Sequence, residues 1–494
     1  MEERQEPGAV ARSVARNSLV QLVGRGMTMA VAVGTLTLLS RYLGPHDFGQ
    51  YQFVIAFVLL VNLSDLGVSS IAVRHLSTME RDPDDLMGNV ITVRTTLAGL
   101  AVAVAITIAF VLGYSTETKV AIGVASLSFP FAILSVSYTA AFAANLRMEY
   151  ASLGNVAQGL TTLVGMGLVV LAGGGLVPLL AAFSAGFFAN SLVCLLFVRR
   201  FVRPQFRYDA AYCRKILRDA IPLGLAVIVV TAYERMGVLF LNAFTDSGDG
   251  AVGYYTFAYR LVDLAFPLSF MFVGSVYPLL SAHHGKDEMR EFRRLYQRSQ
   301  DLLAVCAVSV SLGVMLFAHP MVQLIGGDQF LPAVRNLRIV SAAFAFIWVS
   351  SLVNYSLIAV GRQTMLIPIA FVGLAVNLGV NLTLIPAFGS EGAAAATAST
   401  EAAVLACGLF VLSRYIGGLP SFSVAGKLLT VSGIITGVLW ALPLHWIPEA
   451  AIAIVLLVVG VAVSRVVSAE EVRMLLRPRA AAREVATQPA VIGN

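Results

Sequence analysis

The sequence has few charged residues and no cysteine pattern that would support a metal site or a disulfide framework. Charged residues make up 13% of the chain, whereas soluble domains carry about 25%. The four cysteines lie far apart and form no CxxC pair. The net charge of +6 is small for a protein that binds nucleic acid. These features argue against a soluble enzyme, a disulfide-rich domain and a nucleic-acid partner.

The sequence also lacks the signatures of nucleotide hydrolysis and of hydrolytic catalysis. It contains no GxxxxGK[ST], so the chain carries no ATPase of its own. HExxH and GxSxG are missing, and no repeated segment suggests the selectivity filter of a channel. The first twenty residues do not have the order of a secretory signal peptide. We therefore expect no enzyme activity and no cofactor.

Long apolar runs are what the sequence has in abundance. Hydrophobic residues make up 58% of its 494 residues. A bilayer core of about 30 Å is crossed by about 20 helical residues, and the runs are continuous rather than alternating, so helices are expected instead of barrel strands. We count fourteen spans, at 17–39, 51–73, 89–112, 119–144, 153–173, 177–198, 220–244, 252–280, 298–318, 334–360, 365–386, 392–413, 427–446 and 449–467.

The basic residues of the loops give an independent test of this count. If the N-terminus is cytoplasmic, the inside segments carry 26 Lys or Arg and the outside loops carry 4. Positive charge is concentrated in cytoplasmic loops of membrane proteins. The bias therefore predicts an even number of spans, a multi-pass protein of the cytoplasmic membrane, and both termini in the cytoplasm.

The most basic loop, residues 199–219, separates two blocks of six spans. Phe48–Phe53, before the second span, resembles Val252–Phe257, before the eighth. Two parallel repeats in a carrier are typical of two lobes that face each other across a site near the midplane. We predict an all-α integral membrane protein, with a cytoplasmic N-tail (1–16), an N-lobe (17–198), a basic linker (199–219), a C-lobe (220–417), two added spans (418–468) and a cytoplasmic C-tail (469–494).

Charged and polar side chains inside the spans mark a candidate cavity. A charge at the centre of a membrane helix costs roughly 2.5–3.5 kcal/mol, so such groups face water or one another. Helical spacing aligns them in stripes on the first two spans of each block. The residues are Gln21 and Arg25, Asn62 and Asp65, Glu234 and Arg235, and Tyr255, Tyr259, Arg260 and Asp263. These stripes predict a cavity between the lobes.

Several other intramembrane groups have simpler interpretations. Glu234 and Arg235 are adjacent and about 100° apart on a helix, so we expect each to find its partner elsewhere. Arg94 is close to the cytoplasmic surface and is expected to snorkel there. Glu401 follows a Gly/Ala-rich turn and is expected to lie at a helix end. Asn377 and Asn381 are expected to form hydrogen bonds between helices.

Three ordered segments resemble a known family. They are Ser40–Tyr51 (SRYLGPHDFGQY), Leu324–Phe330 (LIGGDQF) and Ile385–Ala394 (IPAFGSEGAA). Together they are similar to the polysaccharide-exporter (Wzx-like) branch of the MOP superfamily of flippases. The resemblance implies two six-helix lobes and a rocking movement that flips an oligosaccharide linked to polyprenyl pyrophosphate.

The resemblance also assigns roles to the cavity residues. It implies that Arg25, Arg235 and Arg260 contact the substrate pyrophosphate, because arginine stays charged and binds phosphate bidentately. The acids Asp65, Glu234 and Asp263 would bind a coupling H⁺ or Na⁺, or hold the arginines. The implied partners are a lipid-linked oligosaccharide, membrane lipids, and proteins of polysaccharide polymerisation or assembly.

Other functions compatible with the sequence are a cation-coupled multidrug exporter of the MATE type, a lipid II flippase, and a scaffold in a glycan-assembly complex. Cationic drugs would favour a cavity dominated by acids and aromatic residues. Here the cavity arginines and acids are balanced, which favours a substrate with an anionic head group.

Overall fold

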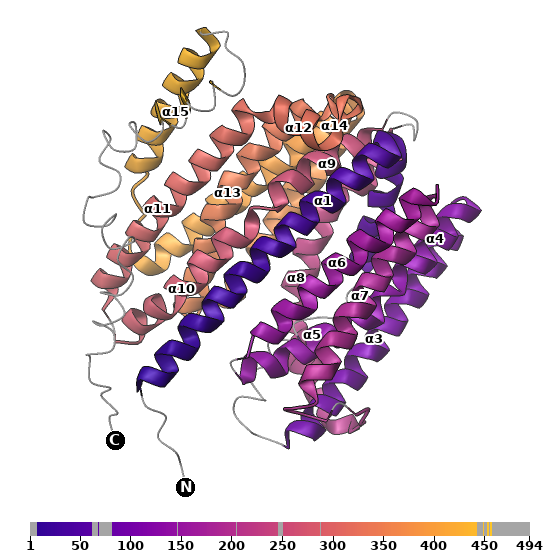
Figure 1. Cartoon of the computed structure of the whole chain (residues 1–494). Helices are drawn as coiled ribbons and strands as arrows, with labels where there is room; N and C mark the ends of the chain where they lie inside the picture. Colours follow the sequence, from indigo (N-terminus) through magenta and orange to yellow (C-terminus); the bar gives the residue numbers. More distant parts are fainter. Residues whose placement is uncertain are drawn as a thin grey trace.

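The protein is helical throughout the described residues, as Figure 1 shows. The computed structural model describes residues 7–61, 82–145, 147–203, 205–245, 250–286 and 288–441, with positions 68, 448, 452–453 and 455–456. No strand occurs in these ranges. The α-helices are α1 (Pro7–Val61), α3 (Pro83–Val111), α4 (Thr116–Ser126), α5 (Ser128–Ala144), α6 (Glu149–Leu171), α7 (Leu176–Val198), α8 (Ala210–Phe244), α9 (Ala251–Asp263), α10 (Phe266–Gly285), α11 (Met289–Leu316), α12 (Ala318–Gly326), α13 (Ala333–Ala359), α14 (Leu366–Ile416) and α15 (Ser423–Ala441). Two short 3₁₀-helices, η2 (Asp328–Phe330) and η3 (Gln363–Met365), lie between them.

The predicted membrane-spanning class is confirmed. Nine segments of the described residues are helical, long enough and apolar enough to cross a bilayer. The total of fourteen stays a prediction, because the end of the second predicted span and most of the last one lie outside the described residues. The cytoplasmic C-tail (469–494) also lies outside them, whereas residues 7–16 of the predicted N-tail belong to α1.

Two pairs of predicted spans are joined by sharp bends instead of loops. Helix α1 bends at Gly44, with φ 71° and ψ 175°, and α14 bends at Gly389, with φ 53° and ψ −126°. Only glycine takes such positive φ values without a clash of its Cβ atom. Pro45 and Pro386 lie near these bends, and each removes a backbone N–H that a straight helix would use.

Two predicted single spans are divided in the structure. The fourth span breaks at Leu127, between α4 and α5, and the eighth breaks between α9 and α10. Pro130 and Pro267 lie in the first turns of α5 and α10, where proline is tolerated because its missing N–H would have no partner within the helix. Helix α12 also lies in a segment for which the hydropathy count predicts only a loop.

The helices form two lobes that meet along α1. In the N-lobe α6 packs against α7 and α1, and α5 against α3 and α7. In the C-lobe α13 packs against α14, α11, α9 and α10, and α14 against α8. Figure 1 shows α1 running between the two groups, and it contacts α8, α9 and α12 of the C-lobe. Helix α15 packs on α11 at the edge of the C-lobe.

The boundary between the lobes differs from its predicted form. Helix α8 begins at Ala210, inside the predicted linker 199–219. The carboxylate of Asp209 caps it by accepting hydrogen bonds from the backbone N–H groups of Ala211 and Tyr212, at 3.1 and 3.2 Å. A capped helix start of this kind satisfies the free N–H groups of the first turn. The second half of the linker therefore extends α8 rather than forming a loop.

Close packing of α6 on α7 depends on Gly186. A Cβ atom at this position would overlap the hydroxyl of Thr162 and lie 2.9 Å from the backbone oxygen of Gln158. We expect Gly186→Val to destabilise the protein by about 1–3 kcal/mol through overpacking, and to lower the yield of monodisperse protein in detergent. Gly167→Val, at a helical position with nothing within 4 Å, is the matched control. Equal yields from both variants would contradict this description of the interface.

Candidate functional site

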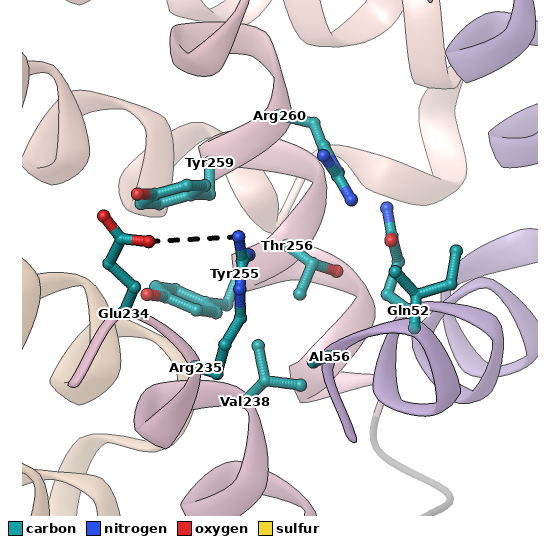
Figure 2. Close-up of a pocket in the computed structure, with 10 residues that line it drawn as sticks. Gln52, Ala56, Glu234, Arg235, Val238, Tyr255, Thr256, Tyr259 and Arg260 are labelled. Carbon is teal, nitrogen blue, oxygen red and sulfur yellow. Dashed lines mark ion pairs between the residues drawn. The ribbon is translucent and has the colours of Figure 1, made fainter. Parts of the chain in front are cut away.

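A pocket lies between the C-terminal part of α1 and helices α8 and α9. It is partly open to solvent. Figure 2 shows nine of its lining side chains, which come from all three helices. They are Gln52 and Ala56 of α1, Glu234, Arg235 and Val238 of α8, and Tyr255, Thr256, Tyr259 and Arg260 of α9. Ile55 completes the lining. The pocket therefore lies on the predicted spans two, seven and eight.

Two arginines supply the positive charge of this pocket. The Nη2 atom of Arg235 lies 4.0 Å from a carboxylate oxygen of Glu234, and Figure 2 marks this ion pair. The expectation that these neighbours would not pair is wrong, because both side chains are long enough to turn toward the same space. Nη1 of Arg260 lies 3.5 Å from Asp263, one turn along α9. Each arginine thus has one weak carboxylate partner.

Arg235 is incompletely satisfied by the protein. Its Nε atom is buried and has no hydrogen-bond partner among the described residues. An unpaired buried donor costs about 1–3 kcal/mol, and more when it belongs to a charged group. The guanidinium of Arg260 lies across the pocket, near the Gln52 amide (Figure 2). Two guanidinium groups that face a shared space and keep free donors form a suitable environment for an anion.

The two tyrosines form an aromatic wall beside Glu234. Their ring centroids lie 6.1 Å apart. The hydroxyl of Tyr255 lies 2.8 Å from the Thr397 hydroxyl of α14, which fixes the ring. Tyr255 is only 3% exposed. Tyr259 and Glu234 also line a second pocket inside the C-lobe.

The second pocket contains two carboxylates. Its lining consists of Tyr233, Glu234, Tyr259, Asn377, Thr397, Thr400 and Glu401. Glu401 is 8% exposed and lies inside α14, so its expected position at a helix end is wrong. The bend at Gly389 folds α14 back, and this brings the side chain of Glu401 against the core of its own lobe.

The predicted hydrogen bond between helices is confirmed for Asn377, whereas Asn381 bonds within its own helix. The side-chain amide of Asn377 donates to Thr400 Oγ1 at 3.1 Å, across the two halves of α14. Asn381 donates to the side-chain oxygen of Asn377 at 2.7 Å. The carboxylate pocket is therefore lined by an ordered polar network.

The remaining predicted site residues do not line the arginine pocket. Arg25 is exposed, and its Nη1 lies 3.4 Å from the backbone oxygen of Pro267 at the start of α10. Asp263 acts on the arginine pocket only through its ion pair with Arg260. Gln21 lies in α1, but its side chain lies outside the described residues, as do Asn62 and Asp65 entirely. Of the predicted cavity residues, the structure thus brings Glu234, Arg235, Tyr255, Tyr259 and Arg260 to one pocket, and the shared cavity of the whole set stays a prediction.

Arg94 corrects another expectation. It is 1% exposed, and its Nη1 donates to the hydroxyl of Ser137 on α5 at 3.0 Å. The residue lies in the middle of α3 rather than at its end, so its side chain points into the N-lobe instead of reaching the membrane surface.

Two residues of the arginine pocket, Gln52 and Thr256, do not belong to the predicted polar stripes. They are 6% and 7% exposed. Gln52 follows Phe48 by one helical turn and precedes Ala56 by another, so all three share one face of α1. A single amide among apolar residues on that face is the signal that could have marked it.

Comparisons with known proteins agree with this architecture. A model of the polysaccharide biosynthesis protein family matches residues 14–284, which is more than half of the chain. The chain belongs to the polysaccharide biosynthesis protein family. A MatE family model also matches residues 222–383, within the C-lobe of this family member.

Two relatives of the family member come from Haloferax volcanii. One is the probable low-salt glycan biosynthesis flippase Agl15, which is 24% identical over 208 residues, covering 42% of this chain and 44% of the relative. The other is the probable flippase AglR, 24% identical over 220 residues, covering 43% and 44%. The chain spans less than half the length of the two relatives it matches.

Solved structures share the fold over most of its length. The lipid II flippase MurJ in an inward closed conformation matches with a TM-score of 0.76 and 15% identity, covering 91% of this chain and 98% of that structure. An inward-facing multidrug resistance MATE family transporter of the MOP superfamily matches with a TM-score of 0.64 and 16% identity, covering 81% and 98%. These likenesses establish the fold, two lobes of transmembrane helices.

Proposed function

We propose that this protein moves an oligosaccharide linked to polyprenyl pyrophosphate across the cytoplasmic membrane by alternating access of its two lobes. The observation that carries the proposal is the pair Arg235 and Arg260, which face one pocket between the lobes while Arg235 keeps a buried donor unpaired among the described residues. A pyrophosphate supplies several acceptor oxygens for such donors. The family match and the relatives described as flippases support the same function.

The pocket is suited to hold the head group while the rest of the substrate stays outside it. Tyr255 and Tyr259 offer aromatic faces beside the arginines. Arg25, on the side of α1 that faces α10, would contact the phosphate after a movement of α1. The polyprenyl tail stays in the bilayer.

The second pocket supplies a route for coupling. Glu234 lines both pockets, so its charge is shared between the arginine site and the carboxylate site. A proton or Na⁺ bound between Glu234 and Glu401 would remove a partner from Arg235 and strengthen its hold on an anion. Binding of the ion and of the pyrophosphate would then be linked, and such linkage is reciprocal. Asp65 and Asp263 are further carboxylates of this proposal.

The remaining proposals concern surroundings and partners. The distribution of basic loops supports cytoplasmic termini. The protein would act as a transporter and not as an enzyme, next to the proteins that polymerise or assemble the glycan. The two carboxylates and tyrosines favour a second candidate, a cation-coupled multidrug exporter, and the fold also fits a lipid II flippase.

Depletion of the protein in its host separates these functions. The proposal predicts accumulation of one complete oligosaccharide repeat on polyprenyl pyrophosphate, measured by mass spectrometry of extracted lipids, with loss of that glycan outside the cell. Accumulation of lipid II would identify the peptidoglycan precursor as substrate instead. An unchanged lipid-linked pool together with new sensitivity to cationic drugs would contradict the proposal in favour of the exporter.

A further inference from the structure

The bend of α1 is fastened to the C-lobe by hydrogen bonds to backbone oxygens. Nη2 of Arg41 donates to the oxygen of Leu324 at 2.8 Å, and its Nε donates to that of Ile325 at 3.4 Å. The Ser40 hydroxyl also donates to Ile325, at 3.3 Å. In the other direction, the Gln329 amide donates to the backbone oxygens of Ser40 and Arg41, at 3.1 and 3.4 Å. These bonds join the two lobes directly.

Glycines allow the two backbones to meet at the same place. A Cβ atom at Gly49 of α1 would lie 2.9 Å from the backbone nitrogen of Gly253 in α9. A Cβ atom at Gly253 would overlap the carbonyl oxygen of Pro45, and one at Gly250 would lie 2.9 Å from the Pro45 ring. Small residues permit this kind of backbone approach between membrane helices.

Three phenylalanines fill the space behind these contacts. Phe48, Phe257 and Phe330 come from α1, α9 and η2, and each is 0% exposed. The ring centroids of Phe257 and Phe330 lie 4.5 Å apart, and Phe48 meets Phe330 edge-on at 5.6 Å. Gly326 makes room for them, because a Cβ atom there would lie 2.7–2.8 Å from Phe330 and Phe257. The cluster is a water-excluding seal.

We call residues 40–49, 250–257 and 324–330 together the α1 clasp. It adjoins the arginine pocket and shares Tyr255 and Thr256 with the lining of that pocket, and Gln52, also in the lining, is one helical turn beyond Phe48. Two of the three segments that resemble the flippase family, Ser40–Tyr51 and Leu324–Phe330, meet here. The roles proposed for Arg235 and Arg260 do not explain why these two segments resemble the family.

We propose that the α1 clasp is the gate that closes the pocket toward the outside of the membrane, and that its hydrogen bonds hold the protein in the conformation described here. The inference rests on the alternating movement in the proposed function. The distribution of basic residues places Arg41 outside. Because the hydrogen bonds between the lobes here all end on backbone oxygens and the clasp is built on a bend, it can separate as a unit when the lobes rock.

Labelling of a cysteine in the pocket tests the gate. The reporter is Gln52→Cys in a chain whose native Cys194, Cys213, Cys306 and Cys407 are replaced by alanine. Intact cells are treated from outside with a membrane-impermeant maleimide. We expect slow labelling in this parent, and at least threefold faster labelling after Arg41→Ala with Gln329→Ala. Arg335→Ala is the control, because Arg335 pairs with Glu391 within the C-lobe and does not touch the clasp.

An unchanged labelling rate in the double variant, an equal rise in the Arg335 control, or fast labelling of the parent from outside would each overturn the proposal. Gly253→Ala is a second way to weaken the clasp, and it keeps every side chain that forms a hydrogen bond there. It should also raise the rate, whereas Gly274→Ala, at an open position of α10, should not. The assay measures access and not flipping, so a failed gate and a wrong substrate give different results.

Discussion

Arg235→Gln is expected to reduce flipping of the lipid-linked oligosaccharide at least tenfold. The variant has a shorter polar side chain and loses the charge and three of the five N–H donors. A hydrogen bond to a charged group contributes about 1.5–3 kcal/mol, and each 1.4 kcal/mol is about a factor of ten in binding. The readout is the pool of lipid-linked repeat units in depleted cells that express the variant, with Arg260→Gln examined in parallel.

Two further variants make this prediction specific. Arg235→Lys keeps the charge but not the planar fork of donors, so it should restore flipping only in part. Arg335→Gln removes an arginine whose side chain is 78% exposed and is not part of the pocket lining, and it should behave as wild type. Full rescue by Arg235→Gln would remove Arg235 from the binding site while leaving the pathway assignment intact.

Glu401→Gln is expected to uncouple transport from an ion gradient. Glu401 and Glu234 line one pocket, and two carboxylates in a confined space attract a proton or a cation. Replacing one of them by an amide removes that attraction and leaves the shape unchanged. We expect the flipping rate in proteoliposomes to fall on the order of tenfold under a favourable gradient, since 1.4 kcal/mol of coupling corresponds to that factor. We also expect it to become independent of the gradient.

The choice of ion follows from the same experiment. Collapse of a proton gradient or of a sodium gradient should slow the wild type but not Glu401→Gln. Glu117→Gln, in the exposed first turn of α4, is the control for loss of an acid elsewhere. If Glu401→Gln keeps the full gradient dependence of the wild type, the carboxylate pocket has no part in coupling.

The fold was predictable from sequence because its main determinant is composition. Continuous apolar runs in a chain with 13% charge leave transmembrane helices as the only arrangement that satisfies the backbone. The bends at Gly44 and Gly389 fall where Gly and Pro interrupt the runs. The breaks before Pro130 and Pro267 are different, because the hydropathy stays high through them and only the proline marks a change in direction.

The site was predictable only to the level of helix faces. The helical spacing placed Arg235 on one face of α8, and Tyr255, Tyr259 and Arg260 on one face of α9. These two faces line the same pocket. It gave no distance between helices, so it could not show that Arg25 contacts α10 rather than the pocket. The inward burial of Arg94 and Glu401 depends in the same way on long-range packing. The α1 clasp joins residues nearly 300 positions apart, for example Ser40 and Gln329, which no local pattern reveals.

Binding of a pyrophosphate lipid to the purified protein tests the central claim most directly. Native mass spectrometry in detergent would compare polyprenyl pyrophosphate with polyprenyl monophosphate of the same chain length. The account predicts that wild type and Arg335→Gln prefer the pyrophosphate at least tenfold, and that Arg235→Gln with Arg260→Gln loses this preference. Equal affinity of wild type for the two lipids, or a preference that survives in the double variant, would contradict it.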